Sequence, residues 1–224
     1  MCMSNTKQLG LAWTMYAGDY REILPPNQNG GGARGWVDGW LDFTVNHADN
    51  TNTVFLTKSK LGPYTQSVGI YRCPADNFLC KVGGKDVLRV RSVSMNGFLE
   101  GYAYGNSPGS TWYPDYFAFN KMTDIINPAP SSLWVFDDEH PDSINDGWEI
   151  TNVTDRNSWT DLPASYHNRA GGFNFADGHS EIKSWKAKST EVKVKRQQYN
   201  GFPIADKNYI DIDWMIAHSS AKRK

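Results

Sequence analysis

The sequence predicts an α+β fold in which an N-terminal amphipathic helix packs on a mainly antiparallel β-sheet with long loops. A helical repeat of apolar residues at the start of the chain predicts the helix, and short β-branched and aromatic segments after it predict the sheet. The chain has 20 Gly and 11 Pro among 224 residues, which indicates many turns between these elements. No long linker divides the sequence, so we expect one domain.

The first helix is expected from about residue 3 to residue 19. Leu9, Ala12 and Tyr16 recur at the i, i+3, i+7 spacing of a buried helix face. Pro25-Pro26 prevents the helix from continuing. Because the helical pattern begins almost at once, we expect the chain to be a truncated part of a longer protein.

Shorter elements follow the first helix. The β-branched stretch VLRVRSVSMNGFL predicts a strand, and LWVFDDEH is the best candidate for a buried strand. We also expect a short strand pair or an extended arm and a short helix. In chain order, these segments are residues 37–45 (arm), 53–67 (helix), 87–99 and 133–140 (strands).

The stretch FNFADGHSEI predicts a β-hairpin, because Asp-Gly is a favoured two-residue hairpin loop. With Asp177-Gly178 at the tip, alternate residues on each strand share a face. This register pairs Ala176 with His179 and Asn174 with Glu181. It places Phe173, Phe175 and Ile182 on the buried face and Asn174 and Glu181 on the exposed face.

Nine residues separate His167 from Asp177-Gly178, and the hairpin does not explain this histidine. The glycines at 171 and 172 let the backbone approach another segment closely. His167 is therefore expected to donate a hydrogen bond to Asp177 or to a backbone carbonyl, with metal ligation and acid–base chemistry as alternatives.

An acidic stretch, DDEHPDSINDG, gathers five carboxylates that repel one another unless they are solvated, paired or bound to a cation. Calcium is one candidate, although Ile144 stands where an EF-hand needs an oxygen ligand. A hydrogen-bonded turn, or a transition-metal site of His140, His167 and His179, are the alternatives. The carboxylates are Asp137, Asp138, Glu139, Asp142 and Asp146.

The chain has three cysteines, Cys2, Cys73 and Cys80. Cys73 and Cys80 lie seven residues apart, so they could close a small disulfide in an oxidising compartment or remain two free buried thiols. A zinc site needs about four ligands, and this pair has no matching second pair in the sequence.

Charge and motif content exclude several functions. The formal net charge is −1, so we expect no nucleic-acid partner. The sequence contains no GxSxG, HExxH or phosphate-binding glycine loop, so we expect no enzyme activity. One alternative role is an extracellular carbohydrate-binding module that stacks sugars on exposed tryptophans. The candidates are Trp36, Trp40, Trp112 and Trp159.

Several motifs together resemble one family of proteins. His167, nine residues, then Asp177-Gly178 is similar to the C-terminal signature of the prepilin-type H-X9-DG proteins, which are pseudopilin-like. The first helix and the turn after it (2–27), LGPYTQSVGIYRCPAD (61–76) and RVRSVSMNG (89–97) resemble the N-terminal and interior motifs of that family in the same order.

The resemblance implies a structural subunit of a type II secretion or type IV pilus-like filament at the cell envelope. Residues 1–22 would be the C-terminal half of a longer helix, and residues 23–224 the globular head. The family's prepilin peptidase site and apolar half-helix are absent from this sequence. In full length, that half-helix would anchor the subunit in the inner membrane, with the head facing the periplasm or the cell surface.

The same resemblance implies partners and ligands. Other pilin-like subunits would bind through the N-terminal helix, and the chain as given is expected to be soluble and monomeric. A calcium site in a late loop is implied only by analogy with other pseudopilins. No other cofactor is expected.

Overall fold

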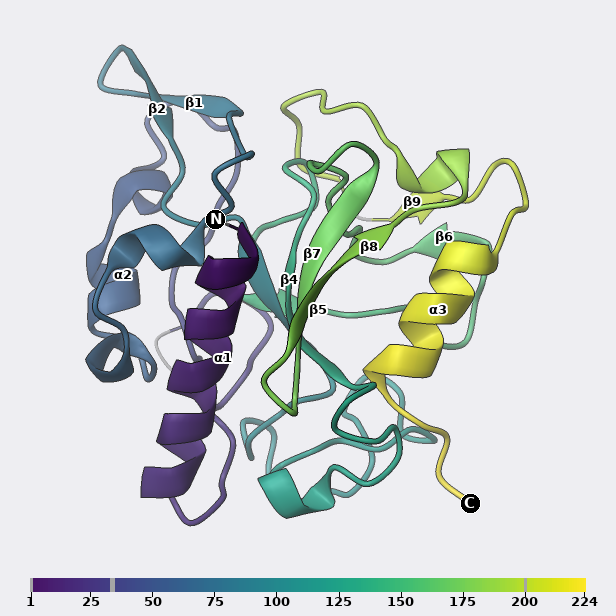
Figure 1. The fold of residues 1–224 in the computed structure, drawn as a ribbon. Coiled ribbons are helices and arrows are strands. Elements are labelled where there is room, and N and C mark those ends of the chain that lie inside the picture. The colour runs from purple at the N-terminus through teal and green to yellow at the C-terminus, as the bar shows by residue number, and fades with distance from the viewer. Residues whose placement is uncertain (1, 33–34, 200) are drawn as a thin grey trace.

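The computed structural model describes residues 2–32, 35–199 and 201–224 and has the α+β fold that the sequence predicts. Figure 1 shows the arrangement of its elements. The helices are α1 (Cys2–Asp19), α2 (Val54–Thr57) and α3 (Ile210–Ser219). The strands are β1 (Leu79–Val82), β2 (Lys85–Leu88), β3 (Val93–Asn96), β4 (Trp134–Asp138), β5 (Trp148–Glu149), β6 (Ser158–Trp159), β7 (Ala170–Phe175), β8 (Ser180–Ser184) and β9 (Phe202–Pro203).

Within the described residues, five strands form a central sheet in the order β5-β3-β4-β7-β8. β3–β4, β4–β7 and β7–β8 are antiparallel, and the short β5 runs parallel to β3. β1 pairs with β2, and β6 pairs with β9, as two smaller antiparallel units. The predicted strand around residues 133–140 is β4, and all of its residues are buried.

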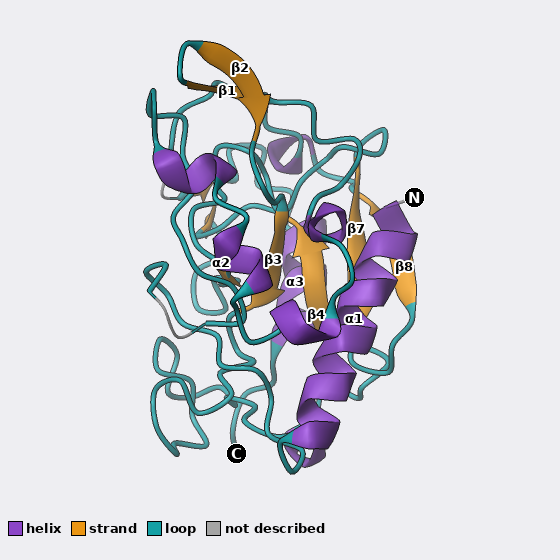
Figure 2. Ribbon diagram, turned by 90° about the vertical axis from the view of Figure 1, so that its left-hand side faces the viewer, coloured by secondary structure: helices purple, strands orange, loops and turns teal. Residues whose placement is uncertain are grey.

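The two longer helices cover opposite faces of the central sheet. Figure 1 shows α1 on one side of β4, β7 and β8 and α3 on the other side. In Figure 2, α1 is in front of the sheet and α3 is behind it. The predicted stripe of α1 is confirmed, since Leu9, Ala12 and Tyr16 are buried. None of the described helices combines the length and apolar character that a membrane crossing requires.

The sequence pattern does not predict helix α3 (Ile210–Ser219). It packs with a cluster of aromatic rings on its face of the sheet, where Trp214 lies 5.1 Å from Phe173 between ring centroids. Ile212 and Met215 of α3 are buried in the same cluster. Trp134, Phe175 and Trp185 complete the sheet side of this cluster.

Two predicted elements differ in the structure. Of the two alternatives for residues 37–45, the strand pair does not form, and the predicted strand 87–99 is interrupted between Leu88 and Val93. The interruption contains two buried arginines. Arg89 donates to the carbonyl of Pro141 at 3.0 Å, and Arg91 donates to that of Asn145 at 3.1 Å. These hydrogen bonds fix residues 89–92 as a loop, so β2 and β3 do not join into one continuous strand.

The β7–β8 hairpin has a register one residue away from the predicted one. Phe173 pairs with Glu181, and Asn174 pairs with Ser180. The N–H of Phe175 donates to the carbonyl of His179, so three residues form the loop instead of two. Gly178 adopts φ +91° at the last loop position, a conformation that glycine allows and that suits a three-residue turn.

The faces of this hairpin also differ from the prediction. Asn174 is fully buried beneath α1, because the sheet is covered on both sides. Ile182, expected in the core, is 37 % exposed. Phe173 and Phe175 are buried as predicted.

Candidate metal centre

Four potential metal ligands from distant parts of the chain meet at the N-terminal end of α1. They are Cys2, Cys73, Asp138 and His167, and their ligand atoms all lie within 4.8 Å of one another. Cys2 Sγ lies 3.0 Å from Asp138 Oδ2, and Cys73 Sγ lies 3.2 Å from His167 Nε2. His167 Nε2 is 3.5 Å from Asp138 Oδ2. We call these four residues the Cys2–His167 cluster.

Backbone and amide contacts position the two cysteines. Cys2 begins α1, and Cys73 follows a 3-10 turn at Val68–Tyr71. The N–H of Cys73 donates to Ser92 Oγ at 2.8 Å. The Asn5 side-chain amide of α1 donates to the carbonyl of Arg72 at 3.1 Å. The helix and the Cys73 loop are thus tied together beside the sulfur atoms.

The carboxylate and the imidazole come from the central sheet. Asp138 is the last residue of β4, and His167 precedes β7. Asn168 and Arg169 both have positive φ, 53° and 67°, and the N–H of His167 donates to the carbonyl of Ala170 at 3.1 Å. This tight turn directs His167 back toward the end of β4.

A glycine makes room for the cluster. A Cβ on Gly172 of β7 would lie 2.9 Å from both Asp138 Oδ2 and Cys2 Sγ. Cβ atoms essentially never approach heavy atoms that closely. Gly172 therefore leaves the space in which these two ligand atoms face each other.

Burial and mutual contacts set the protonation of the cluster. Cys2, Cys73 and Asp138 are buried, whereas the His167 side chain is 25 % exposed. The hydrogen bond from Cys2 lowers the pKa of the Cys73 thiol, and the same contact raises the pKa of Cys2. The hydrogen bond to Asp138 raises the pKa of His167.

The cluster differs from the sites that the sequence suggested. Of the two alternatives for Cys73 and Cys80, the structure has the second, because both are free, buried thiols and no disulfide joins them. Cys73 faces the cluster, whereas Cys80 Sγ lies 3.5 Å from the carbonyl of Val87. Cys73 and Cys80 are close in sequence, but Cys80 lies in the β1–β2 hairpin and faces Val87 instead of Cys73.

The predicted lock between His167 and Asp177 is wrong. Asp177 instead contacts His179, with 2.6 Å between Oδ1 and Nδ1, at the exposed tip of the β7–β8 hairpin. His140 is buried elsewhere, with Nε2 2.9 Å from the carbonyl of Val192. The proposed trio of His140, His167 and His179 is therefore not brought together.

The five predicted carboxylates are fully buried and face different partners. Asp142 accepts from the backbone N–H of Lys195, and Asp146 accepts from that of Trp148 at 2.8 Å. Glu139 accepts from Ser94 and Ser143, whereas both carboxylate oxygens of Asp137 have no hydrogen-bond partner among the described residues. Of the five, Asp138 alone belongs to the Cys2–His167 cluster. Calcium binding by this stretch stays a prediction.

Most of the tryptophans proposed to stack on sugars are not accessible. Trp36 and Trp159 are buried, and Trp40 is half-buried. Trp112 is 52 % exposed. These positions do not form a flat platform of exposed rings.

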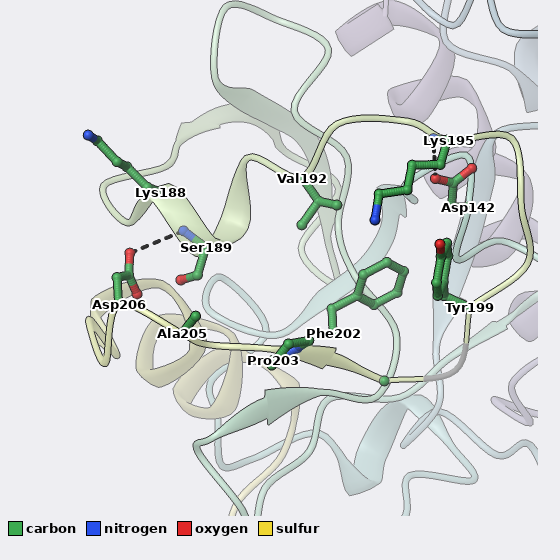
Figure 3. Close-up of a pocket in the computed structure, with 11 residues that line it drawn as sticks. Asp142, Lys188, Ser189, Val192, Lys195, Tyr199, Phe202, Pro203, Ala205 and Asp206 are labelled. Carbon is green, nitrogen blue, oxygen red and sulfur yellow. Dashed lines mark hydrogen bonds between the residues drawn. The ribbon is translucent and has the colours of Figure 1, made fainter.

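A separate cavity of about 440 Å³ lies beside the segment that follows β8. Figure 3 shows Tyr199 and Phe202 beside Lys195 at one end and Ser189 with Asp206 at the other. The amine of Lys195 lies 5.4 Å from the centroid of the Tyr199 ring, and the N–H of Ser189 donates to Asp206 at 3.1 Å. This cavity shares no lining residue with the Cys2–His167 cluster.

Comparison with known proteins places the chain in a family. The family model described as "SBP_bac_10: Protein of unknown function (DUF1559)" matches residues 1–133. Neither the curated proteins nor the solved structures gave a match. The matched part contains Cys2 and Cys73, and Asp138 and His167 follow it. Because the match covers more than half of the sequence, the chain belongs to the SBP_bac_10 (DUF1559) family.

Proposed function

We propose that the protein is a pilin-like structural subunit of a filament at the cell envelope, of the type II secretion or type IV pilus-like kind. The supporting observation is the position of α1, which lies along one face of the central sheet (Figure 2). One side of the helix is buried against its own subunit, and the other side is free for contact with a neighbour. The resemblance of the sequence motifs to prepilin-type proteins supports the same role.

The free side of α1 carries apolar residues. Met3, Leu11 and Met15 are 43 %, 60 % and 48 % exposed. Leu11 and Met15 are one helical turn apart, so they share a side of the helix. Exposed apolar side chains on one helix side are the groups that helix-to-helix packing between subunits would bury.

The proposal includes partners and location. Other copies, or related pilin-like subunits, would bind through α1. An apolar anchor would hold the protein in the inner membrane, with the head facing the periplasm or the cell surface. The role is mechanical, and it requires no reaction and no nucleic acid.

Photo-crosslinking in the bacterium that carries the gene tests this proposal. A photoreactive amino acid at Leu11 should give crosslinks between copies, whereas one at Ile126, which is 78 % exposed on a loop outside α1, should give none. Equal yields from the two positions, or no crosslinks from Leu11, would contradict assembly through α1.

A further inference from the structure

We propose that Cys2, Cys73, Asp138 and His167 form a structural zinc site that fastens the N-terminal end of α1 to the central sheet. This inference goes beyond the filament role and does not depend on it. It rests on the convergence of four donors, on a buried carboxylate oxygen without a partner, and on the space left by a glycine.

The separations within the cluster fit a tetrahedral metal ion. Zinc lies about 2.3 Å from thiolate sulfur and about 2.0–2.1 Å from imidazole nitrogen and carboxylate oxygen, so neighbouring ligand atoms in a tetrahedron lie roughly 3.3–3.8 Å apart. The cluster shows 3.0 Å, 3.2 Å and 3.5 Å for three of its pairs, with every pair within 4.8 Å. Small side-chain rotations would bring all four to a common centre.

Hydrogen bonds among the four residues do not satisfy the buried carboxylate. Asp138 is fully buried, and its Oδ1 has no hydrogen-bond partner among the described residues. An ionised carboxylate in the interior is unfavourable unless a charge or several hydrogen bonds compensate it. A bound cation would supply that charge directly.

A disulfide between Cys2 and Cys73 is the competing arrangement. It would remove the thiol hydrogen that Cys2 shares with Asp138 and leave that carboxylate with His167 as its partner within the cluster. Gly172 leaves room for Cys2 Sγ and Asp138 Oδ2 in either arrangement. Only the metal site gives a role to all four donors and a charge to compensate the buried carboxylate.

The donor set selects the class of metal. Two thiolates, one imidazole and one carboxylate match the ligands of tetrahedral zinc. Calcium and magnesium need oxygen ligands, and copper(I) prefers sulfur without carboxylate. With four protein ligands no coordination position is left open, as in structural zinc sites. The partly exposed edge of His167 gives the ion a path from solvent.

The site would join segments that are far apart in sequence. Cys2 and Asp138 are 136 positions apart, and Cys73 and His167 are 94 apart. The ion would connect α1, the loop after the 3-10 turn, the end of β4 and the turn before β7. Because such a site does not exist in the unfolded chain, the free energy of metal binding would add to folding stability.

Metal binding is tested on the chain of residues 1–224, purified under reducing conditions without a polyhistidine tag. Elemental analysis should find about one zinc per chain, as expected for a single four-ligand site. Replacement of zinc by Co²⁺ should give thiolate-to-cobalt charge-transfer and tetrahedral ligand-field absorption bands. The wild-type cobalt spectrum needs no variant, so it remains informative even where a substitution impairs folding.

Matched variants identify the ligands. Cys73→Ser and His167→Ala should weaken Co²⁺ binding, measured by competition with a chelator, by at least about tenfold, because each removes one of four ligands. Cys80→Ser removes a buried thiol outside the cluster and should leave affinity and spectrum unchanged. Circular dichroism of each variant separates ligand loss from unfolding.

Two results would overturn the proposal. One is a folded wild-type protein, with three titratable thiols, that shows no cobalt spectrum. The other is a Cys2–Cys73 disulfide, seen in non-reduced peptide maps of metal-free protein, together with no zinc binding after that disulfide is reduced. Neither result affects the crosslinking experiment at Leu11, so the filament proposal is tested independently of the zinc site.

Discussion

The two faces of the central sheet hold their helices by different means. On the α1 side, β7 presents Gly172 and Asn174, and the helix approaches closely through Gly10. On the α3 side, the same strand presents Phe173 and Phe175 to an aromatic cluster. A single strand therefore supplies a close polar contact on one face and a thick apolar layer on the other, because its side chains alternate.

The two helices therefore differ in how strongly and in how precisely they are attached to the central sheet. Aromatic packing on the α3 face buries much apolar area and tolerates small shifts of the helix. On the α1 face, the Gly10–Asn174 contact and the Cys2–His167 cluster fix the helix at particular points. If α1 contacts a neighbouring subunit, as proposed, these fixed points would set the orientation in which it does so.

The aromatic face should show the largest loss of stability. Phe173→Ala removes a fully buried ring that contacts Trp134, Trp185 and Trp214. We expect a decrease of about 3–5 kcal/mol in the free energy of unfolding, measured with urea. Ile126→Ala, at an exposed position, should change it by less than about 0.5 kcal/mol. A loss below 1 kcal/mol for Phe173→Ala would contradict the role given to this cluster.

Stability should also depend on pH through carboxylates buried near the aromatic face. Burial raises the pKa of Asp161 from 3.8 to about 7, so the folded protein keeps this proton over a range in which the unfolded chain releases it. The free energy of unfolding should therefore fall as pH rises from about 4 to about 7, by up to about 1.4 kcal/mol per pH unit for this group. Burial likewise raises the pKa values of Asp137 and Glu149, which act in the same direction.

Urea unfolding at pH 5 and pH 7.5 checks this dependence. Asp161→Asn should reduce the slope, because the uncharged amide does not titrate. Asp86→Asn, in an exposed ion pair with Lys81, serves as the control and should leave the slope unchanged. A protein that becomes more stable between pH 5 and pH 7.5 would show that these carboxylates are compensated in solution.

A pair of glycine substitutions tests the α1 face. A Cβ on Gly10 would overlap the buried amide of Asn174, so Gly10→Ala should destabilise the protein by about 1–3 kcal/mol. Gly18 lies in the same helix with open space around it, so Gly18→Ala should stabilise the protein by about 0.4–1 kcal/mol. Opposite signs for the two substitutions would support close docking of α1, and equal signs would argue against it.

The smallest effect on folding is expected on the outward side of α1. Leu11→Ser should change the free energy of unfolding by less than about 0.5 kcal/mol, because this side chain is mostly exposed. The same substitution should lower the yield of crosslinks between copies from a photoreactive residue at Met15. Unchanged yield, with normal expression, would place the contact between subunits elsewhere.

Local patterns predicted the elements that depend on local sequence. The spacing of Leu9, Ala12 and Tyr16 identified α1, and the apolar run before Asp137 identified β4. The hairpin at Asp177-Gly178 was found, but its register was wrong by one residue. Gly178 permits either a two-residue or a three-residue loop, and the local sequence does not decide between them.

The candidate site depended on contacts that sequence spacing does not reveal. His167 was singled out, and Asp138 was named among five acidic residues, but their association was not predicted. The spacing of Cys73 and Cys80 allows either a disulfide or two free thiols, and neither alternative includes Cys2, to which the fold brings Cys73. The odd number of cysteines, with Cys2 left unassigned, is the sequence signal that points to a further partner for Cys73.

The position of β8 at the border of the central sheet has a consequence for how copies can meet. Border strands carry open backbone donors and acceptors that invite strands of other molecules to add on, which leads to aggregation. Glu181 and Lys183 place charges of opposite sign along β8, and such charges disfavour continuation of the sheet into a second molecule. These charges therefore oppose pairing of β8 with a strand of a second molecule.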